Sequence, residues 1–241
     1  MSLLMEESPE TPRAKLPTTP VLITAATKWE AVPLAKGLGL TPTAEARFEG
    51  TVGGRRVVLI KTGMGALKTA AVLEKEFVAD DFGLAVSAGL CGAMQEGIRT
   101  GDLVADAQGI DLDYVVPLRE TAATLNIPFH FGKILHTNIV LTPAKKRALG
   151  AEHRMLACDM ETASVRRWAN AKLPVIGARV VLDEIDEEIP SDAPQSEDTV
   201  ALARYALSHA AQLPRLIKTG MKSGRAMKNL TKFLKAYLET I

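Results

Sequence analysis

Carboxylates stand at the ends of apolar segments in this chain. Asp159, Met160 and Glu161 form an acid–Met–acid triplet before a helical stretch, Asp183 ends an apolar run, and Glu30 lies just past another. An unpaired buried carboxylate is costly, so acids in such positions commonly serve chemistry. They can transfer protons or accept hydrogen bonds from hydroxyl groups. The alternatives without a chemical role are a solvated loop acid for Asp183 and helix N-terminal acids for Glu161 and Glu30.

The elements that would position these acids alternate along the chain. Strands are predicted over four buried apolar runs and one hairpin around Gly53-Gly54: residues 21–26, 84–88, 103–107, 175–182, and 46–52 with 55–61. Helices are predicted over residues 29–38, 67–78 and 162–171. This alternation predicts an α/β fold of three layers, with a mixed central sheet flanked by helices.

Four loops follow predicted strands: residues 26–30, 62–65, 89–92 and 183–186. In α/β folds, sites lie beyond the carboxyl ends of strands, so we expect these loops to converge. The middle of the chain is harder to interpret. Residues 114–131 give no clear pattern, while 134–141 are interpreted as a strand and 143–149 as the start of a helix.

Composition excludes several classes of protein. Lys+Arg 29 against Asp+Glu 28 argues against a nucleic-acid binder. Two cysteines and four histidines without ligand spacing predict neither a disulfide framework nor a metal site. We find no signal peptide, membrane span, P-loop or dinucleotide fingerprint, which predicts a cytoplasmic protein. Residues 1–20, rich in Pro, Thr and Glu, are expected to be a disordered lead-in.

Four motifs in order resemble the nucleoside phosphorylase and nucleosidase superfamily, which includes methylthioadenosine/adenosylhomocysteine nucleosidase. They are T-G-M-G at 62–65, S-A-G-L-C-G at 87–92 with the later Gly101-Asp102, D-M-E at 159–161, and the strand ending on Asp183. The resemblance covers residues 21–190. Within the superfamily the chain is similar to the hopanoid-associated phosphorylases, on G-L-C-G, V-L-T-P at 140–143, C-D-M-E-T, and Q-L-P-R-L-I at 212–217.

The resemblance implies a role for each acid in cleaving an N-ribosidic bond. Asp183 would protonate N7 of the leaving purine, which requires a setting that raises its pKa. Glu161 would accept hydrogen bonds from the ribose hydroxyls. Glu30 would activate an attacking water, whereas Lys28 in the same loop could serve phosphate in a phosphorylase. The sequence leaves hydrolysis and phosphorolysis both open.

The resemblance also places a substrate-binding set around the nucleoside. Met160 would pack on the ribose, Met64 would lie near the 5′ substituent, and a loop backbone would approach the sugar through Gly89, Leu90, Cys91 and Gly92. Val140 and Leu141 would sandwich the base, with plain core as their alternative. Leu90 and Leu182 replace serines of the nucleosidases and make the site more apolar. The Cys91 side chain is interpreted as a small packed residue.

The expected function is release of adenine from an adenine nucleoside with a bulky apolar 5′ group, such as adenosylhopane. Phosphate is the candidate co-substrate, and no metal or organic cofactor is implied. Two enzymatic alternatives are a methylthioadenosine/adenosylhomocysteine nucleosidase and a general purine nucleoside phosphorylase. A nucleoside-binding, membrane-associated scaffold is the non-enzymatic alternative. The family resemblance suggests a homo-oligomer.

The end of the chain differs from residues 21–212, which are expected to form the catalytic domain. Basic residues recur every three or four positions over 213–241, opposite an apolar face. This pattern predicts a basic amphipathic helix, which either contacts an anionic membrane surface at the inner face or docks its apolar side on protein.

Overall fold

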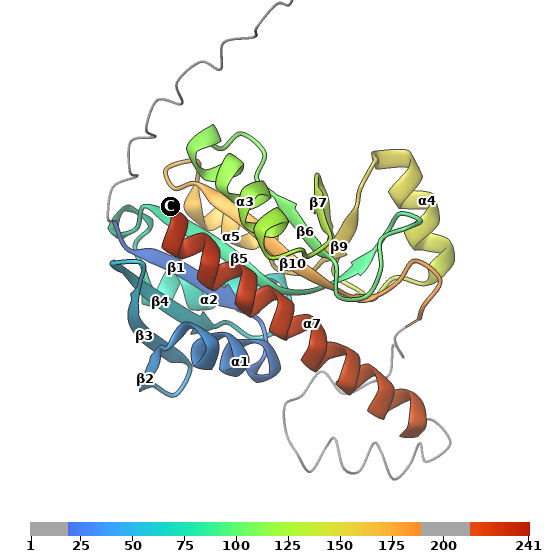
Figure 1. Ribbon diagram of the computed structural model, residues 1–241, viewed down its shortest axis with the longest axis horizontal. Helices are drawn as coiled ribbons and strands as arrows, with labels where there is room; N and C mark the ends of the chain where they lie inside the picture. The colour runs from blue at the N-terminus through green and yellow to red at the C-terminus, as the bar shows by residue number, and fades with distance from the viewer. Residues whose placement is uncertain (1–18, 189–212) are drawn as a thin grey trace, which may run out of the picture.

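The computed structural model describes residues 19–188 and 213–241, and only the backbone of 213–219. One ten-stranded sheet runs through the molecule, and its main path has the order β2-β3-β4-β1-β5-β10-β6-β7 (Figure 1). β9 pairs with β5 and β8 beside this path. The strands are β1 Val21–Ala25, β2 Thr41–Ala44, β3 Arg47–Val52, β4 Arg55–Lys61, β5 Leu84–Ala93, β6 Leu103–Asp106, β7 Phe129–Phe131, β8 Ile134–His136, β9 Ala157–Asp159 and β10 Val175–Asp183.

Parallel pairing joins the centre of the sheet, where β4, β1, β5 and β10 lie in succession. β10 pairs antiparallel with β6, and β5 pairs antiparallel with β9. The sheet is therefore mixed, and the expected fold class is confirmed. The carboxyl ends of β1, β4, β5 and β10 meet at one edge, which is where the chemistry-bearing loops were expected.

Helices cover both faces of the sheet. They are α1 Lys28–Leu38, α2 Ala66–Glu76, α3 Leu112–Thr124, α4 Pro143–His153, α5 Thr162–Ala169 and α7 Leu213–Thr240, with a short 3₁₀ turn at Ala79–Asp81. In β1, Val21 and Ile23 pack toward α1, α3 and α7, while Leu22 packs toward α2 and α5. The alternation follows from the two-residue period of a strand, and it explains why the central strands are apolar on both sides.

Most predicted elements are present, but two have other bounds, and α3, β2, β7 and β9 were not predicted. Residues 89–92 were expected to be a loop but continue β5 to Ala93. Only Ile134–His136 of the expected strand 134–141 is a strand. Helix α3 occupies a segment that gave no sequence pattern, and Pro117 lies inside it. β9 accounts for the first difference, because its pairing with Gly92 and Ala93 extends β5 beyond the apolar run.

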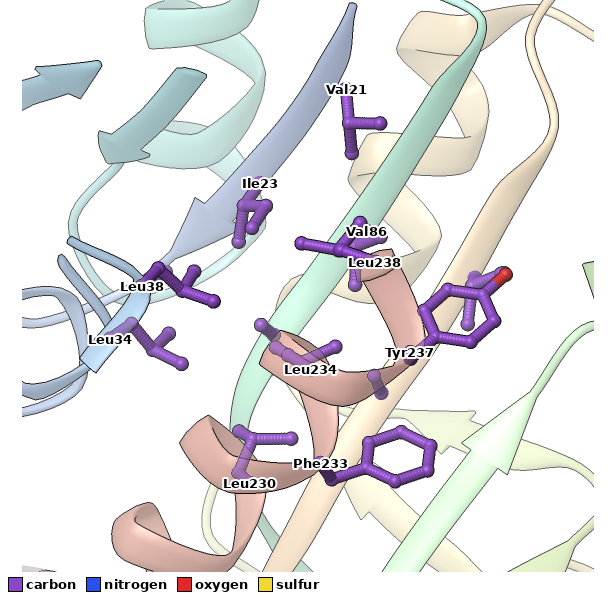
Figure 2. Close-up of a cluster of buried hydrophobic side chains, with 14 of the residues drawn as sticks. Val21, Ile23, Leu34, Leu38, Val86, Leu230, Phe233, Leu234, Tyr237 and Leu238 are labelled. Atoms are coloured by element: carbon purple, nitrogen blue, oxygen red, sulfur yellow. The ribbon is translucent and has the colours of Figure 1, made fainter. Parts of the chain in front are cut away.

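Helix α7 packs its apolar face into the main core. Figure 2 shows Leu230, Phe233, Leu234, Tyr237 and Leu238 directed at the sheet, close to side chains of β1, β5 and α1. All five are fully buried. The Tyr237 hydroxyl also donates to the carbonyl of Tyr114 at 3.2 Å. The helix is therefore part of the same core as the rest of the described chain.

This packing determines which surface of the C-terminal helix is left for a partner to contact. From Ala226 onward its apolar side is occupied by the domain, while the basic residues Arg225, Lys228, Lys232 and Lys235 remain exposed. No helix in the described ranges is both long and apolar enough to cross a bilayer.

Membrane contact, the cytoplasmic location and the homo-oligomer stay predictions. The lead-in 1–20 falls almost wholly outside the described residues, as do residues 189–212 at the end of the predicted catalytic domain.

Candidate active site

A buried arginine lies at the centre of the predicted site. Arg179 on β10 is 1% exposed, and its Nη2 lies 2.6 Å from Asp159 Oδ2. The same nitrogen donates to Ser87 Oγ at 2.7 Å and to Thr162 Oγ1 at 3.1 Å, while Nη1 lies 3.6 Å from Glu161 Oε2. An arginine stays charged when buried, so this group is a fixed positive centre among carboxylates.

Glu30 reaches this centre from the start of α1. Its Oε2 accepts hydrogen bonds from the backbone and hydroxyl of Thr27, both at 2.9 Å, which forms a capping box. Its Oε1 accepts the N–H of Leu90 at 2.8 Å. A Cβ placed on Gly89 would lie 2.4 Å from this oxygen and 2.7 Å from Arg179 Nη1, so only glycine fits between them. Helix capping therefore fixes a buried glutamate against β5.

Glu161 precedes α5 and faces the loop after β4. Its Oε1 accepts the N–H of Gly65 at 2.8 Å. Burial raises the pKa of Glu161 to about 7, although Arg179 and the Gly65 hydrogen bond act in the opposite direction, and Asp159 and Glu30 contribute to the rise. Three carboxylates thus gather around one guanidinium, an arrangement with surplus negative charge. We call Glu30, Asp159, Glu161 and Arg179 the sugar end of the site.

Asp183 lies farther along the same pair of strands. Gly89 is paired with Arg179 and Gly92 with Asp183, so the two positions are separated by about 10 Å at the usual rise of a strand. A bulge at Leu182 lies between them, and such bulges redirect the following side chain. A Cβ on Gly92 would lie 2.9 Å from Asp183 Oδ2, so any larger residue here would displace the carboxylate.

Asp183 forms a buried ion pair with Lys146 of α4. The lysine is 1% exposed and its Nζ contacts Asp183 Oδ2. It also donates to the carbonyl oxygens of Glu184 at 2.9 Å and Glu187 at 2.8 Å. Burial raises the pKa of Asp183, and the ammonium of Lys146 opposes that rise. We call Asp183 and Lys146 the base end of the site.

The apolar residues of the predicted substrate-binding set occupy different environments. Met64, Leu90 and Met160 are half-buried. Val140 is 37% exposed, whereas Leu141 is buried in a cluster with Met94 and Cys158.

The two remaining side chains of interest are those of Cys91 and Lys28. Cys91 packs with Ala93 and Val181 in a separate apolar cluster, and burial raises the pKa of its thiol. The thiol is therefore a poor nucleophile. The Lys28 ammonium lies 4.8 Å from the centroid of the Trp29 ring.

Sequence reasoning assigned no role to three residues that the structure places in the site. Arg179 carried a signal, since a cation inside the apolar run of β10 requires buried partners. Asp159 was part of the acid–Met–acid triplet without a task of its own. Lys146 lies between Lys145 and Arg147, and a run of three basic residues is typical of a solvated helix face. The described ranges hold no cluster of three or more His, Cys, Asp or Glu suited to a metal ion.

Comparison with known proteins finds a matching sequence profile and similar folds. A sequence profile of the Phosphorylase superfamily matches residues 20–123. Futalosine hydrolase of Helicobacter pylori has a similar structure, with a TM-score of 0.67 at 16% identity over 92% of this chain and 100% of that one. The 5′-methylthioadenosine/S-adenosylhomocysteine nucleosidase of S. pneumoniae has a TM-score of 0.62 at 21% identity over 90% and 99%. No curated protein sequence matches the chain. The chain therefore has the fold of these proteins, and its N-terminal half matches the sequence profile of the Phosphorylase superfamily.

Proposed function

We propose that the protein hydrolyses the N-ribosidic bond of an adenine nucleoside. One observation carries the proposal: Glu161 pairs with the buried cation Arg179 and Glu30 acts on it from across Gly89, while Asp183 lies about 10 Å farther along β5 and β10. The carboxylates that the sequence singled out thus occur at both ends of one short stretch of the sheet. Similarity to a futalosine hydrolase and to nucleosidases supports this reading.

The charges fit the two halves of the reaction. As the bond between C1′ and N9 breaks, its electron pair leaves with the purine and the sugar becomes positive. The surplus negative charge around Arg179 stabilises a positive sugar, and Glu161 can accept hydrogen bonds from its hydroxyls. Glu30 takes a proton from water as the water oxygen bonds to C1′. Asp183 gives its proton to N7 of the departing base, and the products are free base and free sugar.

The same charges favour water over phosphate as the attacking group. A phosphate dianion at the sugar end would meet Glu30, Asp159 and Glu161 with Arg179 already engaged by carboxylates. Phosphate sites normally present cations or backbone donors instead. The ammonium of Lys28 rests over Trp29. Hydrolysis is therefore the proposed reaction, and phosphorolysis is the alternative that the experiment below tests.

The apolar side chains beside the sugar end support a substrate with an apolar 5′ group. Leu90 follows the glycine that separates Glu30 from Arg179, and Met64 precedes the glycine whose N–H binds Glu161. Both side chains are half-buried. A bulky apolar group such as that of adenosylhopane is the largest 5′ substituent that we propose. A methylthioadenosine or adenosylhomocysteine nucleosidase is the closest enzymatic alternative.

A substrate panel tests the proposal. The purified chain is incubated with adenosine, methylthioadenosine, futalosine and a 5′-alkyl adenosine, with and without phosphate, and free base and sugar are separated by chromatography. We expect adenine and unphosphorylated sugar without phosphate, and fastest turnover for the 5′-alkyl compound. Base release that requires phosphate would establish phosphorolysis. No base release from any nucleoside would contradict catalysis altogether and leave the binding scaffold.

Replacing the proposed base sharpens the same assay. Glu30→Gln keeps the shape of the side chain and one oxygen that can accept from Thr27, although its amide nitrogen cannot accept the N–H of Leu90. The amide cannot take a proton, so turnover should fall by about 10²- to 10⁴-fold while binding of a nucleoside persists. Glu45→Gln, which changes an exposed glutamate of the β2–β3 turn, is the matched control. Equal turnover of both variants would remove Glu30 from the mechanism.

A further inference from the structure

Lys146 is a buried cation that the reaction described above does not use. Lysine is among the residues least often fully buried, and its burial costs free energy unless every donor finds a partner. Here all three donors are engaged, by the Asp183 carboxylate and by the carbonyl oxygens of Glu184 and Glu187. No donor is left for a substrate. The lysine therefore acts on the substrate only through Asp183.

The contacts of Lys146 tie α4 to the segment that follows β10. Its neighbours on the helix, Lys145 and Arg147, are exposed. Glu187, whose carbonyl Lys146 binds, also pairs through its carboxylate with Lys222 of α7. A chain of ionic contacts thus fixes the backbone on the carboxyl side of Asp183 from two helices.

We propose that Lys146 is a positioning residue for the proposed cleavage: it fixes the Asp183 carboxyl and sets the pH range over which that carboxyl holds the proton given to the base. The inference rests on the proposed function. A general acid must be protonated to act, and an ammonium in contact with a carboxyl favours its ionised form. Lys146 thus limits the rise in the pKa of Asp183 that burial causes.

Other charged groups near Asp183 act more weakly or in the opposite sense. Glu187 raises the pKa of Asp183, but its own charge is paired with Lys222. The thiols of Cys91 on β5 and Cys158 on β9 also lie close, and burial raises both thiol pKa values, that of Cys158 to about 12. Both thiols are therefore uncharged near neutral pH.

Asp159 of β9 also lies near Cys158, but its carboxylate forms an ion pair with Arg179. Of the groups that act on Asp183, Lys146 alone both contacts the carboxyl and favours its ionised form through its charge. Replacing Lys146 by an uncharged residue is therefore the change that isolates the effect of a positive charge on the ionisation of Asp183.

The test is the pH dependence of kcat/KM for Lys146→Met beside the unchanged chain. Activity should fall as the pH rises through the pKa of Asp183. Without the ammonium that pKa rises, so the alkaline limb should move to higher pH by about one to three pH units. On the acid side of the limb, kcat should fall more than KM rises, because the carboxyl is no longer held in place. Lys146→Arg keeps the charge and should hold the limb closer to that of the unchanged chain.

Two controls separate this role from simple stabilisation. Lys145→Met removes an exposed charge from the same helix. Leu149→Ala loosens the packing of α4 against Met94 and Leu141 without changing charge. Both should leave the limb in place, whatever they do to thermal stability. An unshifted limb in Lys146→Met would overturn the proposal, as would a shift of equal size in Leu149→Ala.

A second readout does not depend on turnover. In protein labelled with ¹³C at aspartate carboxyls, the Asp183 signal is assigned by its loss in Asp183→Asn and then titrated in the unchanged and Lys146→Met chains. An equal titration midpoint in both would refute the inference even if the proposed function held. If Lys146→Met does not fold, Lys146→Gln replaces it, since its amide can still donate to the carbonyls of Glu184 and Glu187.

Discussion

The sugar end and the base end of the site both bury a cation, but they balance charge differently. At the sugar end, Arg179 is surrounded by Glu30, Asp159 and Glu161. At the base end, Lys146 meets Asp183 and two backbone carbonyls. One end carries more anions than cations, and the other matches a single carboxylate with a single ammonium.

The difference follows the chemistry that each end would perform. A surplus of anions stabilises positive charge on the sugar without any proton moving. A proton donor must instead change its own charge during the reaction, and one opposing charge controls how readily it does so. The type of cation fits as well, since the guanidinium binds several acceptors in a plane, whereas the ammonium is a compact point charge.

The sharpest test of the base end is Asp183→Asn. The amide is close in shape but cannot protonate the purine, so we expect turnover to fall by about 10²- to 10⁴-fold. The drop should be measured as kcat for adenine release, with circular dichroism to show that the chain still folds. Turnover within a factor of two of the unchanged chain would mean that the base leaves without this acid.

The comparison predicts that the two cations differ in their effect on stability. Arg179→Met leaves three buried carboxylates without their cation and should lower the free energy of unfolding by roughly 3–5 kcal/mol. Lys146→Met leaves a single carboxyl, which can take up a proton, and should cost less. Urea denaturation at pH 7 measures both. The charge argument fails if the lysine variant is the less stable of the two.

Glu161→Gln should reveal the cost of the surplus charge at the sugar end. Because the pKa of Glu161 is raised to about 7 in the folded protein, its protonated form stabilises the fold below about pH 4.5, and this contribution is lost as the pH rises toward 7. The full loss is on the order of 3 kcal/mol. The variant should therefore be more stable than the unchanged chain at pH 8 and lose this advantage near pH 5, as thermal melting would show. A variant that is less stable than the unchanged chain at both pH values would contradict the idea that the sugar end carries surplus negative charge.

The smallest expected effect comes from Ser87, one of the two neutral side chains that accept hydrogen bonds from Arg179. Ser87→Ala removes an acceptor that lies 2.7 Å from the guanidinium in a fully buried position, which should cost about 1–3 kcal/mol of stability. Thr43→Ala, at an exposed hydroxyl, is the control and should change stability little. A cost equal to that of Arg179→Met would mean that the serine, rather than the charge balance, maintains the sugar end.

Sequence reasoning predicted most of the strands and the acids at their ends, because apolar periodicity reports directly on burial. It extended strand 134–141 too far and ended β5 too early, since pairing with β9 depends on a segment more than sixty residues away. It offered two readings for the C-terminal helix, because an apolar stripe is the same whether lipid or protein covers it. Packing of Leu234 and Tyr237 against the sheet distinguishes them for the buried part of α7.

By itself, the sequence determined the α/β alternation and the candidate acids Glu30, Glu161 and Asp183, because these depend on residue type and local spacing. Tertiary structure alone decided which cation meets which acid. Lys146 and Lys145 are indistinguishable as sequence neighbours, yet one is buried against Asp183 and the other faces solvent. The physical reason is that a charge acts through distance and burial, and both are set by elements far apart in the chain.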